Sequence, residues 1–75
     1  MNKNRRKQLE DLCRKLEELS NKLEDILDDE QDYFDNMPEN LQGSMRGSDS
    51  EEAINLMEEA LGNIEEAIDT INEII

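Results

Sequence analysis

The acidic residues 28–35, DDEQDYFD, are the densest group of side chains in the sequence that could do chemistry. Their carboxylates are oxygen ligands of the kind that Ca²⁺ and Mg²⁺ prefer. An EF-hand loop, however, needs acids at alternating positions, a central Gly and a closing Glu at its twelfth position. Here Tyr33 and Phe34 occupy the centre and no Gly is present. We therefore predict a solvated acidic helix end and no metal site, with weak opportunistic binding of Mg²⁺ or Ca²⁺ left open.

The residue types argue against catalysis. The chain has no His, its single cysteine, Cys13, has no His partner, and no Ser lies in a recognisable nucleophile motif. We expect no enzyme activity, no catalytic residue and no cofactor. Cys13 is interpreted as a small apolar residue at the edge of a helical bundle, and a redox or nucleophilic role is the alternative.

Paired glutamates recur in the second half of the chain as EEAINLM, EEALGNI and EEAIDTI. On an amphipathic helix, charges opposite an apolar stripe are expected as its solvated side. Rows of carboxylates on a rigid rod can also imitate the phosphates of a nucleic acid and occupy a basic groove on another protein. Both interpretations stay open.

The net charge is −13, from 21 acidic and 8 basic residues. Direct binding to DNA or RNA is disfavoured, because phosphate binding needs a cationic surface. The charge is uneven: residues 1–22 carry seven of the eight basic residues, and residues 23–75 carry 17 of the acids beside Arg46 alone. Disorder is not predicted, because the apolar residues are too regularly spaced.

The first apolar run predicts a helix over about residues 3–34, with an a/d heptad seam. Its Leu and Ile residues alternate in spacings of three and four: Leu9, Leu12, Leu16, Leu19, Leu23 and Ile26. A further column at seven-residue intervals flanks and widens this stripe: Cys13, Ser20, Leu27 and Phe34.

The second apolar run predicts a helix over about residues 49–75, with Ser48 as its N-cap and Glu51 completing a capping box. Its seam residues show the same alternation: Ile54, Met57, Leu61, Ile64, Ile68 and Ile71. One column directly precedes alternate seam residues: Ala53, Ala60, Ala67 and Ile74. Small residues there would let a neighbouring helix approach closely.

Residues 35–48 connect the two helices and contain Pro38, which interrupts a continuous helix. We therefore predict an all-α, single-domain protein over 1–75 that folds as an antiparallel two-helix hairpin. Folding back would place basic residues of the first helix (Lys3, Arg5, Arg6 and Lys7) beside acidic residues of the second (Glu65, Glu66, Asp69 and Glu73). Each apolar face is wider than a two-helix seam needs, so two hairpins are expected to form a homodimeric four-helix bundle.

The connection itself predicts a short helical turn over PENLQ that opens at Pro38 and stops at Gly43. Tyr33, Phe34 and Met37 are expected to close the end of the core. The polar residues exceed what a plain connection needs, and longer connections often bind partners. The predicted partner-binding residues are Tyr33, Asn36, Glu39, Asn40, Gln42 and Arg46.

The stretch Y-F-D-N-M-P-E-N-L-Q-G-S, followed by an EEAI-type acidic helix, resembles small uncharacterised proteins of phages and mobile elements in Gram-positive bacteria. The similarity covers the connection and the second helix, about half of the chain. The resemblance implies a small accessory protein of such an element, and it implies no activity and no particular functional residue.

The basic start of the chain leads into an amphipathic pattern, so we expect no signal peptide, no membrane segment and a cytoplasmic location. The leading functional hypothesis is a non-enzymatic interaction protein that self-associates and regulates or inhibits an unidentified protein partner. The alternatives are an acidic mimic that blocks a nucleic-acid-binding protein, and an oligomeric sponge for a nucleotide-like ligand held by Arg46 or the basic N-terminal residues.

Overall fold

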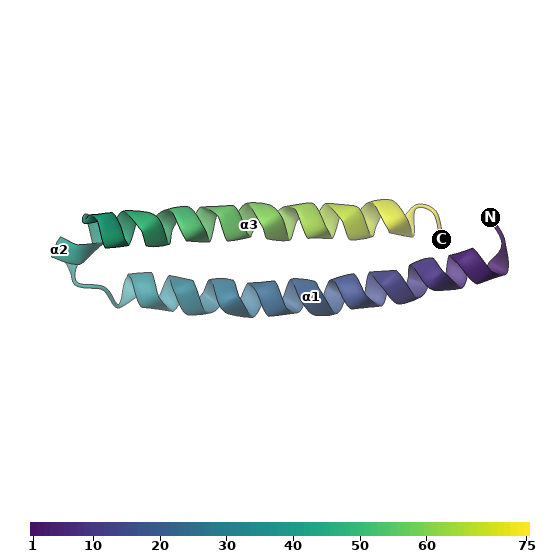
Figure 1. The fold of residues 1–75 in the computed structure, drawn as a ribbon, viewed down its shortest axis with the longest axis horizontal. Helices are drawn as coiled ribbons and strands as arrows, with labels where there is room; N and C mark the ends of the chain where they lie inside the picture. Colours follow the sequence, from purple (N-terminus) through teal and green to yellow (C-terminus); the bar gives the residue numbers. More distant parts are fainter.

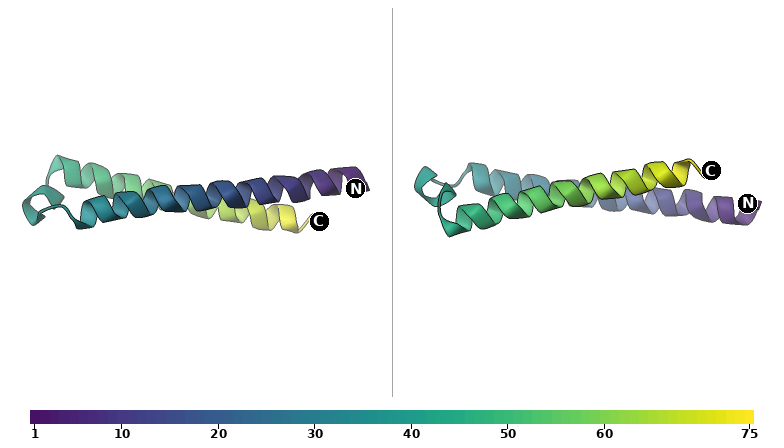
Figure 2. Two further views of the ribbon diagram at one scale, coloured as in Figure 1. Left: turned by 90° about the horizontal axis from the view of Figure 1, so that it is seen from below. Right: turned by 90° about the horizontal axis from the view of Figure 1, so that it is seen from above.

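A computed structural model describes all residues, 1–75, and consists of three helices: α1 (Lys3–Asp35), α2 (Glu39–Gln42) and α3 (Met45–Asn72). α1 and α3 lie side by side and antiparallel, and α2 forms the turn between them (Figure 1). The molecule is a slender rod of 58 × 15 × 12 Å, and the two long helices cross at a shallow angle (Figure 2). The prediction of an all-α hairpin is confirmed.

Both ends of α1 are closed by asparagine side chains. Asn2 is the N-cap, and its Oδ1 accepts a hydrogen bond from the backbone N–H of Arg5 at 2.8 Å. At the other end, Asn36 donates from its Nδ2 to the carbonyl oxygen of Asp32, also at 2.8 Å. The helix cannot continue through Pro38, which lacks an N–H and disfavours helical backbone in the residue before it.

α3 begins earlier than the sequence indicated, at Met45 and not at about residue 49. Its N-cap is Ser44, so the predicted capping role of Ser48 is wrong. Ser48 instead lies within the first turn, where its N–H donates to the carbonyl oxygen of Ser44 at 2.9 Å. The reason is the compact turn: α2 ends at Gln42, and only its C-cap Gly43 and the N-cap Ser44 precede the first residue of α3.

Of the three apolar columns on α1, α3 covers two. Leu9, Leu16 and Leu23 are half-buried in the seam, as the sequence suggested. Their seam neighbours are Cys13 and Ser20, which are only 6% and 7% exposed. The column Leu12, Leu19 and Ile26, which the heptad pattern had placed in this seam, is exposed to solvent.

α3 uses its predicted residues in the seam. Ile54 and Ile68 are buried, and the others are half-buried: Met57, Leu61, Ile64 and Ile71. Two helices have a single line of contact, so a third apolar column on α1 has nothing to pack against within the chain. Small side chains at Cys13 and Ser20 bring the helices close, and the bulkier column is left outside.

The predicted pairing of basic and acidic residues at the terminal end does not form. The only ion pair joins Arg14 to Asp11, within α1. Figure 1 shows the reason: the N-terminal turns of α1 extend past the end of α3, so the basic residues there have no facing helix. The hairpin is therefore not held closed by salt bridges between its two helices.

One polar pair interrupts the seam near the turn. Ser50, which is 4% exposed, donates from its Oγ to Oε2 of the half-buried Glu30 at 2.6 Å. A buried hydroxyl without a partner would cost free energy, so this bond fixes the register of α1 against α3 at that level.

We predict that Ser50→Ala lowers the free energy of unfolding by about 1–2 kcal/mol, because it removes a hydrogen bond to a charged group. The double variant Glu30→Leu/Ser50→Ala should regain that loss or exceed it, since both polar groups leave the seam together. Urea unfolding followed by circular dichroism, at one protein concentration, measures both. A double variant less stable than the single one would contradict this role of the bond.

The turn approaches α3 most closely at Gly47, which is buried. A Cβ added there would lie 2.1 Å from the carbonyl oxygen of Gln42, a backbone atom that cannot move aside alone. Gly62, also within α3, faces open space, with nothing within 4 Å of an added Cβ. The two glycines therefore have opposite expected responses to the same substitution.

Gly47→Ala is expected to lower the free energy of unfolding by about 1–3 kcal/mol through overpacking of the turn. Gly62→Ala is the matched control in the same helix and should raise it by about 1 kcal/mol, the difference in helix propensity. Thermal melts at equal protein concentration should thus move in opposite directions. If Gly47→Ala were as stable as the wild type, α2 would not pack closely on α3.

Candidate functional site

The end of the rod that contains α2 brings together all of the residues predicted to bind a partner. α1 contributes Tyr33 just before its end, α2 contributes Glu39 and Asn40, and the first turn of α3 contributes Arg46. These four side chains are exposed, and Tyr33 retains 50% of its accessible surface. Tyr33 thus does not close the core as the sequence suggested, whereas Met37 is buried and Phe34 half-buried.

Two of the predicted partner-binding residues, Gln42 and Asn36, use their side chains for hydrogen bonds within the chain. The side-chain nitrogen of Gln42 donates to the carbonyl oxygens of Phe34 and Met37, at 3.1 and 3.2 Å. The side chain of Asn36 donates to the backbone of α1, at the carbonyl oxygen of Asp32. The carbonyl of Met37 has no other partner, whereas those of Asp32 and Phe34 also accept backbone N–H groups, from Asn36 and Met37.

The short α2 confirms the predicted turn over Pro38–Gly43, with Pro38 as N-cap and Gly43 as C-cap. Ser44 bonds back from its hydroxyl to the carbonyl of Leu41, which is half-buried. The end of the rod is therefore a closed, hydrogen-bonded unit that presents Tyr33, Glu39, Asn40 and Arg46 outward. We call these four residues the turn surface.

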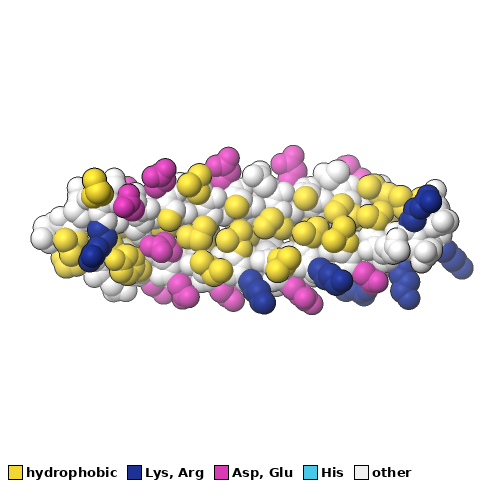
Figure 3. Space-filling view, viewed as in Figure 1, with side chains coloured by type: hydrophobic (Ala, Val, Ile, Leu, Met, Phe, Trp, Pro, Cys, Tyr) yellow, Lys and Arg dark blue, Asp and Glu magenta, His cyan; other side chains and the backbone are white.

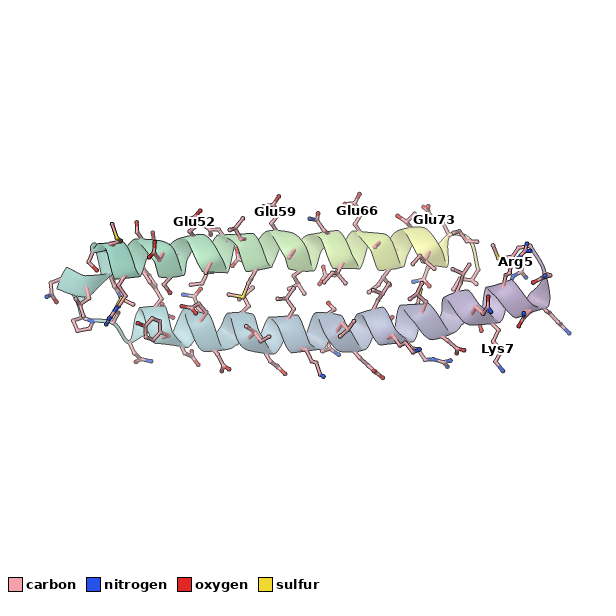
Figure 4. The ribbon with its side chains drawn as sticks, viewed as in Figure 1. Arg5, Lys7, Glu52, Glu59, Glu66 and Glu73 are labelled. Carbon is pink, nitrogen blue, oxygen red and sulfur yellow. The ribbon has the colours of Figure 1, made fainter.

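A second candidate surface consists of carboxylates on the outer side of α3. Glu52, Glu59, Glu66 and Glu73 lie at seven-residue intervals and point away from α1 along the whole helix (Figure 4). No lysine or arginine forms an ion pair with them. This row is the geometrical basis of the mimic hypothesis.

Further carboxylates flank the seam on one side of the hairpin, which we call the acidic face. Two shallow grooves open there, at two levels of the rod. The groove nearer the termini is lined by Glu17, Ser20, Asn21, Glu65, Ile68 and Asp69. The groove nearer the turn is lined by Gln31, Phe34, Glu51, Ile54, Asn55 and Glu58.

The opposite side of the seam carries apolar residues, and we call it the apolar face. It consists of the columns that directly precede alternate seam residues on each helix: Leu12, Leu19, Ile26 and Tyr33 of α1, and Ala53, Ala60 and Ala67 of α3 with Ile74 just beyond its end. In an antiparallel pair these two columns lie on the same side of the seam. The large residues of α1 keep 44%, 55%, 57% and 50% of their surface. In Figure 3, hydrophobic side chains run along one broad face, between an upper edge with acidic side chains and a lower edge with acidic and basic ones.

At the other candidate sites the structure does not bring together side chains that could bind a ligand. The acidic residues 28–35 lie on the helical α1, so their side chains point around the helix and do not converge, and no group of three potential ligands is placed to hold a metal ion. Cys13 is a free thiol buried in the seam. The basic residues proposed to hold a nucleotide-like ligand lie along the N-terminal part of α1 alone: Lys3, Arg6, Lys7 and Arg14.

None of the helices combines the length and the apolar character that a membrane crossing requires. No protein-family model, no curated protein and no solved structure matches the chain. The resemblance of residues 33–44 to phage and mobile-element proteins therefore stays a prediction.

From the sequence, Gln42 and Asn36 were predicted to bind a partner. Their actual hydrogen-bond partners are backbone carbonyls, which no sequence pattern reveals. The sequence pattern also merged the exposed column of α1 with the seam. The heptad columns gave no signal to separate them, because the seam column from Leu9 continues to the charged Glu30, whereas the exposed column continues to Tyr33.

Gln42→Ala is expected to lower the free energy of unfolding by about 1–2 kcal/mol, because the part-buried carbonyl of Met37 loses its only partner and that of Phe34 loses one of two. The matched control is Asn40→Ala, two residues away and exposed, which should change stability by less than about 0.5 kcal/mol. Differential scanning calorimetry at one concentration compares them. Equal melting temperatures for the two variants would mean that the Gln42 side chain does not stabilise the turn, and Gln42 would again be a candidate for partner binding.

Proposed function

We propose that this protein is a non-enzymatic protein–protein interaction module of a phage or mobile element. It self-associates through the hairpin into a four-helix bundle and uses the turn surface to regulate or inhibit a protein partner in the cytoplasm. The observation that carries this proposal is the apolar face: a line of large, exposed, heptad-spaced side chains that the chain does not cover by itself. Contiguous exposed apolar surface of this kind is typical of interaction sites.

The turn surface supports the second half of the proposal. Its four residues combine an aromatic ring, an amide and both signs of charge, and they project from a turn whose backbone is held by Gln42, Asn36 and Ser44. A preorganised turn loses little conformational entropy when a partner binds. Arg46 is the only basic residue between positions 23 and 75, so it offers an acidic group of a partner a single point of attraction.

A second candidate function is the acidic mimic, and one observation favours it. The glutamate row on the outer side of α3 is regular, rigid and free of ion pairs. A basic groove that evolved for nucleic acid would meet carboxylates spaced along a rod, and binding of that type depends strongly on salt. In this case the partner would be a nuclease, a repressor or a similar protein.

One experiment separates the two functions. The tagged wild-type chain is compared as bait in a native host lysate with Asn40→Ala/Arg46→Ala and with Glu52→Gln/Glu59→Gln/Glu66→Gln. We expect the turn variant to lose the captured protein while the glutamine variant retains it, and purified components should show a loss in affinity of more than about tenfold. Circular dichroism checks that both variants keep wild-type helicity.

In the reverse pattern, the glutamine variant loses the captured protein and high salt releases it from the wild type. That result would favour the acidic mimic over binding through the turn surface. A captured protein that both variants retain would contradict both proposals.

A further inference from the structure

We propose that a second copy of this chain covers the apolar face, in an antiparallel arrangement that places the two α2 turns at opposite ends of the dimer. This inference rests on the proposed self-association and adds to it which face is covered and in which orientation. It follows from surface area, from the symmetry of the apolar columns and from the distribution of charge.

The accessible surface of the single hairpin is too large for its mass. It exposes 5783 Å². A compact monomer of 8.7 kDa exposes about 4700 Å², so the excess is roughly 1000 Å². A stable dimer typically buries about 600–1000 Å² on each partner. Covering one broad face of the rod therefore removes about the amount of surface that the hairpin has in excess.

Apart from Met45 at the start of α3, the large apolar side chains exposed on the two long helices gather on the side of the apolar face. Four belong to its α1 column and one, Ile74, to its α3 column, while Leu56 lies beside that column, at the heptad position adjoining it. The opposite side cannot serve as the interface, because stacking it on a second copy would bring glutamates against glutamates. Glu17 and Glu65 line one of its grooves, and Glu51 and Glu58 line the other.

The two apolar columns share one two-fold axis. The column on α1 runs from Leu12 to Tyr33, so its midpoint falls between residues 22 and 23, and the column on α3 runs from Ala53 to Ile74, with its midpoint between 63 and 64. These midpoints lie at the same level of the rod, since the adjacent Asn21 and Glu65 line the same groove. A two-fold axis perpendicular to the rod at this level therefore maps both columns onto themselves.

Around that axis each helix packs antiparallel on its own copy. Leu19 meets Ile26 of the second copy, and Leu12 meets its Tyr33. On α3, Ala60 meets Ala67 of the second copy, where small side chains allow the backbones to approach closely. A closed, two-fold interface of this kind is self-complementary, as most homodimers are.

An alternative two-fold axis, parallel to the rod, would also bury the apolar face, and charge decides between the two. Residues 23–59, the half of the rod next to α2, carry 13 acidic residues against Arg46 alone. The remaining half carries eight acidic and seven basic residues. The parallel axis stacks the two acidic halves on each other, whereas the perpendicular axis places each acidic half on the nearly neutral one. Like charges brought together disfavour the parallel axis.

The first test concerns the face. Sedimentation equilibrium should find a wild-type dimer at micromolar concentration, and Leu19→Asp/Ile26→Asp should raise the dissociation constant at least about a hundredfold, because charges would enter an apolar interface. The matched control, Asn21→Asp/Asn55→Asp, adds the same charge on the side of the acidic face and should remain a dimer. Circular dichroism at high protein concentration verifies that both variants are helical.

The second test concerns the orientation. In a Cys13→Ser background, Asn40→Cys carries a single spin label on α2, and pulsed electron–electron double resonance measures the distance between the two labels of the dimer. We expect a separation near the 58 Å length of the rod and not near its 15 Å width. Sedimentation of the labelled protein confirms that it is still a dimer.

The outcomes separate this inference from the proposal on which it rests. A wild-type monomer at micromolar concentration overturns self-association and this inference together. A dimer that withstands Leu19→Asp/Ile26→Asp overturns the choice of face and leaves self-association intact. A dimer with a short distance between the labels overturns the orientation alone.

Discussion

Burial of a single seam between α1 and α3 is the constraint on which the rest of the structure depends. No ion pair and no disulfide joins the two helices, so the apolar seam and one hydrogen bond, from Ser50 to Glu30, hold them in register. Two helices offer each other one line of contact. α1 carries one apolar column more than that line accommodates, and the exposed face of the hairpin is the direct result.

The turn shows how a short connection can be both structural and available for binding. Its irregular sequence is largely explained by hydrogen bonding to the backbone and close packing: Gln42 and Asn36 donate to carbonyls at the end of α1, and Gly47 allows α2 to lie against α3. The residues that remain free are few and lie together. A binding role for them is chemically reasonable because a fixed backbone presents them, and Tyr33 is the one residue that they share with the apolar face.

The two sides of the seam divide the chemistry of the molecule. One side is acidic, so that two copies of it would repel each other. The other side is apolar, and its columns are symmetric about the middle of the rod. The charge along the rod is also divided, because nearly all basic residues lie before residue 23. In the proposed dimer, the face and the orientation therefore depend on different properties: apolar surface selects the face on which the second copy docks, and charge selects its orientation.

The sequence by itself determined the helical class, the hairpin, the short turn at Pro38 and the seam residues of α3, because heptad spacing and a proline act locally along the chain. It could not decide which two of the three columns on α1 would face α3, nor that α3 starts at Met45. It also could not show that Gln42 and Asn36 are bound to backbone carbonyls. These features were decided by tertiary structure alone, since they depend on how closely two helices approach and on which groups the turn leaves without partners.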